Sequence, residues 1–325
     1  MKLLSYKIAE NQTHQIGVLH NDYIYNLNSF FGDISLIELF QIEEYQNKVE
    51  NYIASQNIVK HSIKNVVLLP PVPQPNSFRD AYAFRQHVET CRKNRGAQMI
   101  SEFDQFPVFY FSNHNSMYAD GQDIEIMPDH FNKLDYELEF AIIIGKGGKN
   151  ILAKDAEQHI AGFCILNDIS ARTLQKEEMK LNLGPAKGKD FANVIGPYLA
   201  TKDELDTKSI DTAFGKKYDL KMQCFVNGEL LSEGNAKNMN WTFAEIIERA
   251  AYGVELFPGD IIGSGTVGTG CLLEINGTNK RKNANYIEKW LKDGDEIKMN
   301  VEGLGSITNK IIKSKNNHSI LKLKK

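Results

Sequence analysis

The segment that most constrains the fold runs from Leu134 to Ala141, reads Leu-Asp-Tyr-Glu-Leu-Glu-Phe-Ala, and continues into three isoleucines. Acidic and apolar residues alternate in it, which is typical of a β-strand with two different faces. Asp135, Glu137 and Glu139 therefore share one face. If the strand is buried, positive charge must lie near these acids, whereas an exposed sheet face with solvated acids is the alternative. The isoleucines that follow favour the buried strand.

Composition narrows the class of protein. The chain has 325 residues, 42% hydrophobic and 24% charged, and its pattern is mixed and strand-rich, as in an ordinary α+β globular protein with one large domain and a smaller one. A net charge of -3 and a pI near 6.3 give no electrostatic reason to expect a nucleic-acid partner or an anionic membrane surface. No apolar run approaches the length of about 18 residues that a membrane span needs.

The four cysteines are widely separated, with no C-x-x-C pair and no histidine at ligand spacing. This pattern indicates neither a zinc site nor a disulfide framework. Together with the absence of an apolar leader at the N-terminus, it predicts a reducing, cytoplasmic location.

Two domains are predicted from the order of the segments. Residues 1–70 are predicted to form a small β-rich domain with one helix. The helix is expected from Ser35 to Ile53, because Ser35 and Glu38 have the spacing of a capping box at its start. This domain is expected to serve structure or dimer contacts. Four prolines between residues 70 and 75 interrupt regular structure and mark the linker. Residues 71–325 form the second domain.

Several polar residues could carry chemistry, and each has a structural alternative. Asp80 and His87 would share one face of a helix, although a lone histidine there is more often structural. Asp168 ends a predicted strand, where it could also cap the next helix. Arg172 and Gln175 are spaced to share a face of that helix. Lys189 lies in a glycine-containing loop that could present it to a ligand, although most loop lysines are solvated.

The loop from Gly263 to Gly268 has the letters G-x-G-x-x-G of a dinucleotide-binding turn. That turn needs a strand before it and a helix after it. The segment Cys271–Gly277 is predicted to be a second strand, so a nucleotide site is rejected. Asn227-Gly228 between two apolar segments predicts a β-hairpin.

These segments, in this order, resemble the fumarylacetoacetate hydrolase superfamily over residues 75 to about 310. Asp80 to His87 resembles its Asp-to-His segment, Glu137-Leu138-Glu139 its E-x-E metal pair, and Asn167 to Lys176 the stretch that supplies the last metal carboxylate. The resemblance implies a metal site made by Asp80, Glu137, Glu139 and Asp168. It implies catalytic roles for His87, Glu274 and Lys189, with Glu274 orienting His87. The substrate contacts expected from it are Tyr82, Tyr110, Arg172, Gln175 and Thr266.

The resemblance also implies a fumarylacetoacetase C-terminal-like mixed β-roll with flanking helices, usually built as a homodimer. An all-oxygen ligand set suits Mg²⁺ or Ca²⁺, with Mn²⁺ as an alternative. The expected activity is hydrolysis of a C–C bond in a β-diketone or acylpyruvate-type substrate. A 2-oxo acid decarboxylase, isomerase or hydratase of the same superfamily, or a non-catalytic metal-binding protein, is the alternative.

Overall fold

A mixed sheet of twelve strands forms the framework of the computed structural model, which describes residues 1–8, 14–55 and 58–321. The strands lie in the order β4-β3-β2-β1-β15-β13-β11-β21-β6-β7, with β5 added to β1 and β8 added to β15. Their bounds are β1 (Lys2–Lys7), β2 (Gln15–His20), β3 (Tyr23–Asn26), β4 (Lys60–Ser62), β5 (Val67–Leu69), β6 (Phe78–Ala81), β7 (Phe109–Ser112), β8 (Met117–Tyr118), β11 (Leu138–Ile144), β13 (Ile160–Asp168), β15 (Asn193–Ala200) and β21 (Ile261–Gly263).

A second sheet of five strands has the order β19-β18-β22-β23-β9. Its strands are β9 (Ile124–Ile126), β18 (Lys221–Val226), β19 (Glu229–Asn235), β22 (Glu296–Val301) and β23 (Gly305–Lys313). The predicted hairpin at Asn227-Gly228 is confirmed, because both residues have positive φ and join β18 to β19. Short pairs complete the strands: β10 (Leu134–Asp135) with β14 (Ser170–Ala171), β12 (Gly148–Lys149) with β20 (Glu255–Leu256), and β16 (Ser209–Asp211) with β17 (Lys216–Tyr218).

The alternation along β11 divides its apolar side chains between two cores. Phe140 and Ile142 belong to the larger core, which also contains residues of the five-stranded sheet such as Met299. Ala141 and Ile143 point to the opposite face and join a second core. Both faces of β11 are buried, so the acidic residues at its start are in the protein interior rather than on a solvated face.

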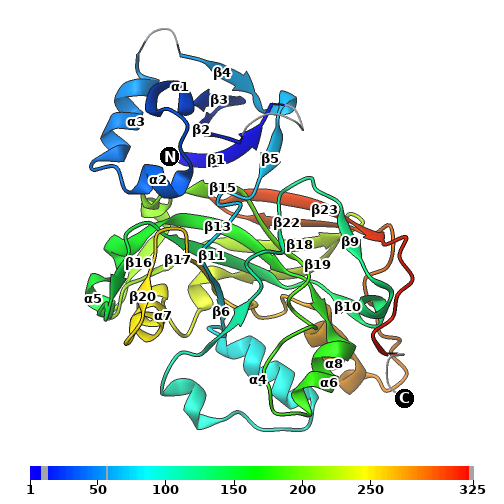
Figure 1. Cartoon of the computed structure of the whole chain (residues 1–325). Helices are drawn as coiled ribbons and strands as arrows, with labels where there is room; N and C mark the ends of the chain where they lie inside the picture. The colour runs from blue at the N-terminus through cyan, green and yellow to red at the C-terminus, as the bar shows by residue number, and fades with distance from the viewer. Residues whose placement is uncertain (9–13, 56–57, 322–325) are drawn as a thin grey trace.

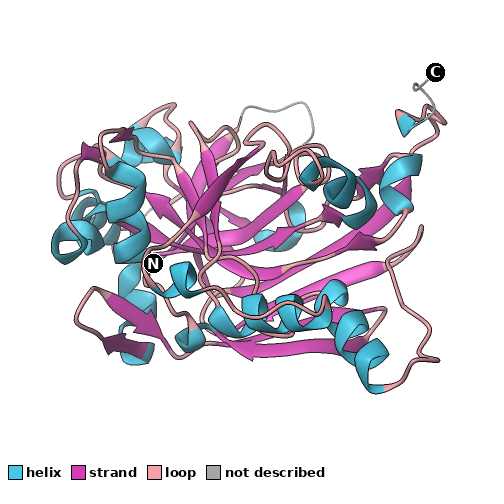
Figure 2. Cartoon of the chain, turned by 90° about the horizontal axis from the view of Figure 1, so that it is seen from below, coloured by secondary structure: helices cyan, strands magenta, loops and turns pink. Residues whose placement is uncertain are grey.

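The helices lie around the strands (Figures 1 and 2). Their bounds are α1 (Asn28–Phe31), α2 (Leu36–Phe40), α3 (Tyr45–Ile53), α4 (Arg85–Asn94), α5 (Ala153–Ala156), α6 (Arg172–Met179), α7 (Phe243–Ala251) and α8 (Leu272–Lys282). Helices α4 and α8 pack against each other, and Figure 1 shows both at the lower end of the molecule with α6. No helix in the described ranges has the length and apolar character to cross a membrane.

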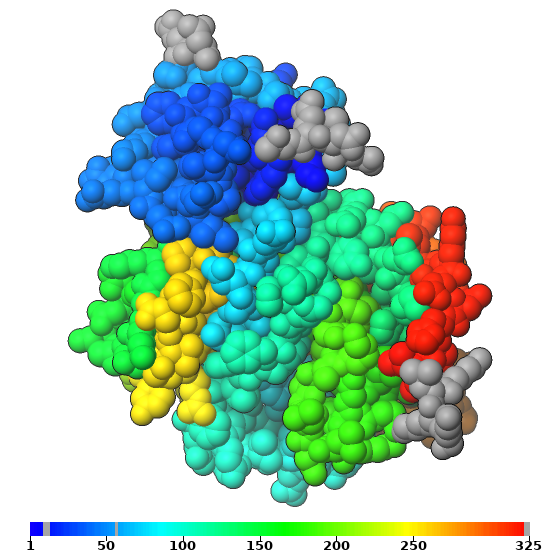
Figure 3. Space-filling model, in the orientation of Figure 1, coloured from blue at the N-terminus to red at the C-terminus, as the bar shows by residue number. Residues whose placement is uncertain are grey.

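Residues 1–8, 14–55 and 58–70 form a lobe at the top of Figure 3. Its strands β1 to β5 belong to the twelve-stranded sheet, and the pairing of β1 with β15 connects them to the strands of the rest of the chain. The lobe also contributes Leu36, Leu39 and Val49 to the second core. The domain boundary at residue 70 stays a prediction.

Four predicted elements differ from the structure. The strand expected from Leu134 to Ala141 is divided into β10 and β11, with Tyr136 and Glu137 between them. The capping box of Ser35 and Glu38 is present, but a break between α2 and α3, with Glu44 in the left-handed region, divides the expected single helix. Asp80 is not helical: it lies in β6, which pairs with β21 and β7, and the helix that carries His87 begins only at Arg85. The segment after Cys271 is helix α8 instead of a strand.

Candidate active site and metal centre

Four buried carboxylates meet at one end of the central strands. Asp80 lies in β6, Glu137 immediately precedes β11, Glu139 lies within β11, and Asp168 ends β13. One carboxylate oxygen from each lies within 4.8 Å of the others. We call this set the carboxylate cluster. The sheet order brings these strands together, since β21 separates β6 from β11, and β13 is the other neighbour of β11.

Glycines make room for this convergence. A Cβ atom on Gly263 would approach the Asp80 Oδ1 atom to 2.4 Å, and one on Gly265 would approach the Ala81 carbonyl oxygen to 2.4 Å. Gly265 also has a positive φ of 78°. Its N–H donates to Asp80 Oδ1 at 3.2 Å, and the Thr266 hydroxyl donates to Glu139 Oε1 at 3.3 Å. The loop that resembles a dinucleotide turn is thus part of the wall of the carboxylate cluster.

That loop does lie between a strand and a helix, because β21 precedes it and α8 follows it. The reason given above for rejecting a nucleotide site was therefore wrong. The nucleotide site is rejected for a different reason. Gly265 and Thr266 contact carboxylates, and carboxylates repel phosphate groups. The helix forms because the Asp135 carboxylate accepts the N–H groups of Leu272 and Leu273, which caps its first turn from a distant strand.

The cluster fits a hard divalent cation. Ligand oxygens lie about 2.0–2.6 Å from Mg²⁺ or Ca²⁺, so two oxygens on opposite sides of the ion are at most about 5 Å apart. The separation in the cluster meets that limit. Glu139 Oε2 and Asp168 Oδ1 are buried and have no hydrogen-bond partner. Buried carboxylate oxygens without partners are costly, and a cation would satisfy both. Asp168 does not cap α6, whose first turn has no side-chain cap.

Two buried cations partly neutralise the cluster. Arg172 donates to Glu137 Oε1 at 2.8 Å and to Asp135 Oδ2 at 2.8 Å. The Lys189 ammonium donates to both Glu137 and Asp168. Lys189 is only 3% exposed, so the solvated-loop alternative does not hold for it. Burial alone would raise the pKa of Glu137, but Arg172 and Lys189 outweigh it and hold that pKa well below its usual value.

The other three carboxyls of the cluster resist ionisation. Burial raises the pKa of Asp168 to about 7, even though Lys189 opposes this shift. Burial also raises the pKa of Asp80. The pKa of Glu139 is raised well above its ordinary value by burial and then by repulsion from Asp80 and Glu137. Carboxyls that share a dry site in this way bind protons or a metal ion in preference to remaining charged and bare.

The predicted substrate residues surround the cluster. Tyr110 on β7 donates its hydroxyl to Asp80 at 2.9 Å and also to Asp168, and the Lys189 ammonium lies 5.9 Å from its ring centroid. Gln175 accepts a hydrogen bond from Arg172 at 3.2 Å. Tyr82 lies further out, with its ring centroid 6.0 Å from that of His87.

His87 and Glu274 form a buried pair beside the cluster. His87 Nδ1 lies 2.7 Å from Glu274 Oε2, and the Thr269 N–H donates to the same oxygen at 2.9 Å. Burial would lower the pKa of His87, but Cys91 and Glu274 raise it to about 10. A backbone bridge between Glu137 and Cys271 connects the start of α8, which carries Glu274, to the cluster. The structure therefore brings all twelve predicted residues into one region, while their roles stay a proposal.

Sequence reasoning gave no role to three residues of this region. Asp135 was noted on the acidic strand face, and that alternation was the signal that could have found its contact with Arg172. Cys91 and Cys271 come from distant segments, and the cysteine spacing was interpreted as indicating no zinc site, although His87 lies four residues before Cys91 in α4 and contacts it. Both cysteines are free thiols in the structure and lie close enough to each other to perturb each other's pKa.

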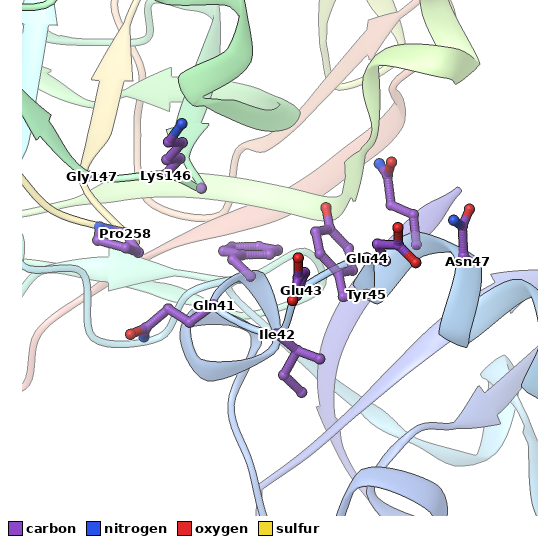
Figure 4. A pocket seen from close by; sticks show the side chains of 12 residues that line it. Gln41, Ile42, Glu43, Glu44, Tyr45, Asn47, Lys146, Gly147 and Pro258 are labelled. Carbon is purple, nitrogen blue, oxygen red and sulfur yellow. The ribbon is translucent and has the colours of Figure 1, made fainter.

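A separate pocket of about 720 Å³ lies away from these residues (Figure 4). It is lined by the segment from Phe40 to Asn47, the turn from Gly145 to Gly147, and Pro258. No carboxylate of the cluster lines it. The chemistry described above therefore lies elsewhere in the molecule.

Comparison with known proteins places the chain. The family model described as "Fumarylacetoacetate (FAA) hydrolase C-terminal" matches residues 76–312. Oxaloacetate tautomerase YisK of Bacillus subtilis (strain 168) is 29% identical over 284 residues, covering 86% of this chain and 83% of that protein.

Two solved structures extend the comparison. A fumarylacetoacetate hydrolase from the psychrophilic Exiguobacterium antarcticum is 25% identical with a TM-score of 0.72, covering 97% of this chain and all of its own. A maleylpyruvate hydrolase from Sphingobium sp. SYK-6, in complex with manganese(II) ion and pyruvate, is 20% identical with a TM-score of 0.72 and the same coverage. The chain belongs to the fumarylacetoacetate hydrolase family, and its strand-rich α+β fold is that of the family.

Proposed function

We propose that this protein is a divalent-metal-dependent enzyme that hydrolyses a C–C bond in a β-diketone or acylpyruvate-type substrate. The observation that carries the proposal is the buried His87–Glu274 pair next to four convergent carboxylates. A structural metal site needs the carboxylates but has no need for a histidine held by a buried acid, so the pair favours an enzyme over a metal-binding protein.

Asp80, Glu137, Glu139 and Asp168 would hold the cation, which is Mg²⁺, Ca²⁺ or Mn²⁺ by the chemistry of the donors. When bound, such an ion polarises the carbonyl oxygens of a chelating oxo acid and stabilises enolate charge. The manganese and pyruvate in the Sphingobium structure support this class of ion and ligand.

The residues of the chain supply the rest of the reaction. In its neutral form His87 donates its Nδ1 proton to Glu274 and leaves Nε2 free to take a proton from water. Because the pKa of His87 is raised to about 10, the fraction of this neutral form, and with it hydrolysis, rises with pH. The hydroxide that results attacks a carbonyl carbon, and the C–C bond breaks as an enolate departs. Lys189 and Arg172 offset negative charge beside Glu137 during this step. In this proposal Tyr110, Gln175, Thr266 and Tyr82 contact the substrate.

A second candidate is the tautomerisation of a 2-oxo acid. The raised pKa of His87 favours an imidazolium near neutral pH, which can return a proton to an enolate and so interconvert keto and enol forms. The relationship to an oxaloacetate tautomerase supports this reaction. It needs the same residues but breaks no C–C bond.

The test is a panel of acylpyruvates, fumarylacetoacetate and oxaloacetate, each with Mg²⁺ or Mn²⁺ supplied and then removed by a chelator. Metal-dependent release of pyruvate or acetoacetate supports hydrolysis. Keto–enol conversion without cleavage supports tautomerisation, and CO₂ release supports decarboxylation. No turnover of any compound would contradict an enzymatic role of this kind. A homodimer and a cytoplasmic location stay predictions, of which the first is measured by light scattering.

A further inference from the structure

A second group of ligand-type side chains lies where helices α4 and α8 pack together. It consists of His87, Cys91, Cys271 and Glu274, all buried, and we call it the thiol site. Ligand atoms of His87, Cys271 and Glu274 lie within 4.8 Å of one another. The Cys91 sulfur is 3.8 Å from His87 Nε2 and 3.9 Å from Nδ1, and Cys271 is a neighbour close enough to perturb the pKa of Cys91. The group therefore gathers two sulfurs, an imidazole and a carboxylate.

These donors differ in kind from those of the carboxylate cluster. Thiolate and imidazole ligands select Zn²⁺ and similar soft or borderline ions, whereas all-oxygen sets select Mg²⁺, Ca²⁺ and Mn²⁺. Zn–S and Zn–N bonds of about 2.3 Å and 2.0–2.1 Å in a tetrahedron place neighbouring ligand atoms about 3.3–3.8 Å apart. Taking Nδ1 as the His87 ligand atom, the Cys91 sulfur lies 3.9 Å from it, close to such a separation, and its contact of 2.7 Å with Glu274 would open by less than 1 Å.

The thiol of Cys91 is prepared for metal binding. Its sulfur lies 3.9 Å from His87 Nδ1 and 3.8 Å from Nε2, so an imidazolium at this position favours the thiolate form. The thiolate is the form that binds metals. Burial raises the pKa of Cys271, the second thiol of the site, as it does for Cys164 and Cys224, so metal binding there must release the Cys271 proton.

We propose that the thiol site binds one Zn²⁺, or a Cd²⁺ of similar preference, through Cys91, Cys271, His87 and Glu274, and that this ion inhibits the enzyme. Inhibition follows because a metal-bound imidazole cannot accept a proton, and because Glu274 no longer orients it. The inhibitory effect rests on the proposed function, whereas metal binding at the thiol site does not.

Binding is tested with Cd²⁺, whose bonds to thiolates absorb in the ultraviolet. The wild-type protein is first saturated with Mg²⁺ to fill the carboxylate cluster, and Cd²⁺ is then titrated. We expect an absorption band that saturates at about one equivalent and is reversed by Zn²⁺. Cys91→Ser and Cys271→Ser should each lose about half of the band and weaken binding at least about tenfold. Cys224→Ser, at a buried thiol outside the site, should keep the full band.

Absence of the band in the wild type, or the same band in all three variants, would overturn the proposal. If a serine variant fails to fold, zinc X-ray absorption of the wild type decides instead. We expect sulfur neighbours at about 2.3 Å together with nitrogen or oxygen at about 2.0–2.1 Å. A shell made only of oxygen and nitrogen would rule out the thiol site.

The activity test is separate from the binding test. With Mg²⁺ in excess, Zn²⁺ should inhibit turnover of whichever substrate of the panel is accepted, and Cys91→Ser should need at least about tenfold more Zn²⁺ for the same inhibition. A wild type that binds Cd²⁺ at the thiol site but resists Zn²⁺ would overturn the inhibitory role alone. If no panel compound turns over, the proposed function fails, while the absorption band still tests the site.

Discussion

Replacing Asp168 with asparagine should stabilise the protein in the absence of divalent cations and abolish its stabilisation by them. Asp168 is fully buried in the carboxylate cluster, and its Oδ1 atom has no partner. In the metal-free protein its charge is therefore unfavourable, although Lys189 contacts it. Asparagine has nearly the same shape and removes that charge. It also removes one of the four proposed metal ligands.

The magnitude follows from the pKa. Burial raises the pKa of Asp168 from 3.8 to about 7 in the folded protein. Between these two pKa values the folded state binds more protons than the unfolded state, so the free energy of unfolding falls as pH rises. Above pH 7 the folded protein bears the full free-energy cost of the ionised Asp168. The change corresponds to about 4 kcal/mol at 1.36 kcal/mol per pKa unit. At pH 8 without metal, Asp168→Asn should thus be more stable than the wild type by up to about 4 kcal/mol, with little difference near pH 4.

Thermal unfolding measures both effects. For a chain of this length, 1 kcal/mol corresponds to about 1.5 °C in Tm, so the metal-free variant should melt up to about 6 °C higher at pH 8. Mg²⁺ at about 100 times its Kd should raise the wild-type Tm by about 4 °C, from a linkage free energy of about 2.7 kcal/mol, and the variant by much less.

The matched control is Asp260→Asn, at a buried aspartate outside the cluster that contacts Ser77, Phe257 and Arg79. It should destabilise the protein with and without metal, because it weakens an ion pair with satisfied hydrogen bonds. A variant at Asp168 that is less stable than the wild type in chelator at pH 8, or that keeps the full response to Mg²⁺, would refute the reasoning.

Three further predictions concern turnover of the substrate identified by the panel. His87→Ala should lower kcat by about 10²–10⁴-fold, because the proposed proton acceptor is lost. The Mg²⁺-dependent rise in Tm should be retained, and its loss would argue against the role given to His87. Glu274→Gln should move the rising limb of the pH–rate profile to lower pH, because Glu274 helps to raise the pKa of His87, which must be neutral to accept a proton; an unchanged limb would contradict this coupling. Lys189→Met should lower kcat by about 10²-fold or more with Mg²⁺ still bound, since it removes positive charge beside Glu137 and Asp168, and a purely structural lysine would instead change only Tm.

The strands and their buried acids could be predicted because they depend on local patterns. The alternation before and within β11 indicates both the strand and the shared face of Glu137 and Glu139. The Asn227-Gly228 hairpin and the capping box at Ser35 are likewise short signals with a direct physical cause. The order of the acids and His87 along the chain made the resemblance to the family recognisable.

The errors arose where distant segments decide the local structure. Asp80 lies in a strand because β21 and β7 pair with it, although its spacing to His87 fits a helix. Helix α8 begins after Cys271 because the Asp135 carboxylate caps it from another strand, and no local residue signals this. The contact between Cys91 and Cys271 has the same origin in the packing of α4 against α8.

The central claim is that one divalent cation is held jointly by four carboxylates from separate strands. A crystal of the protein grown with Mn²⁺ tests it most directly, through the anomalous scattering of manganese. We predict one strong peak within about 2.1–2.5 Å of oxygens from Asp80, Glu137, Glu139 and Asp168. A structure at saturating Mn²⁺ with no peak among these four side chains, or with manganese bound only elsewhere, would contradict the account.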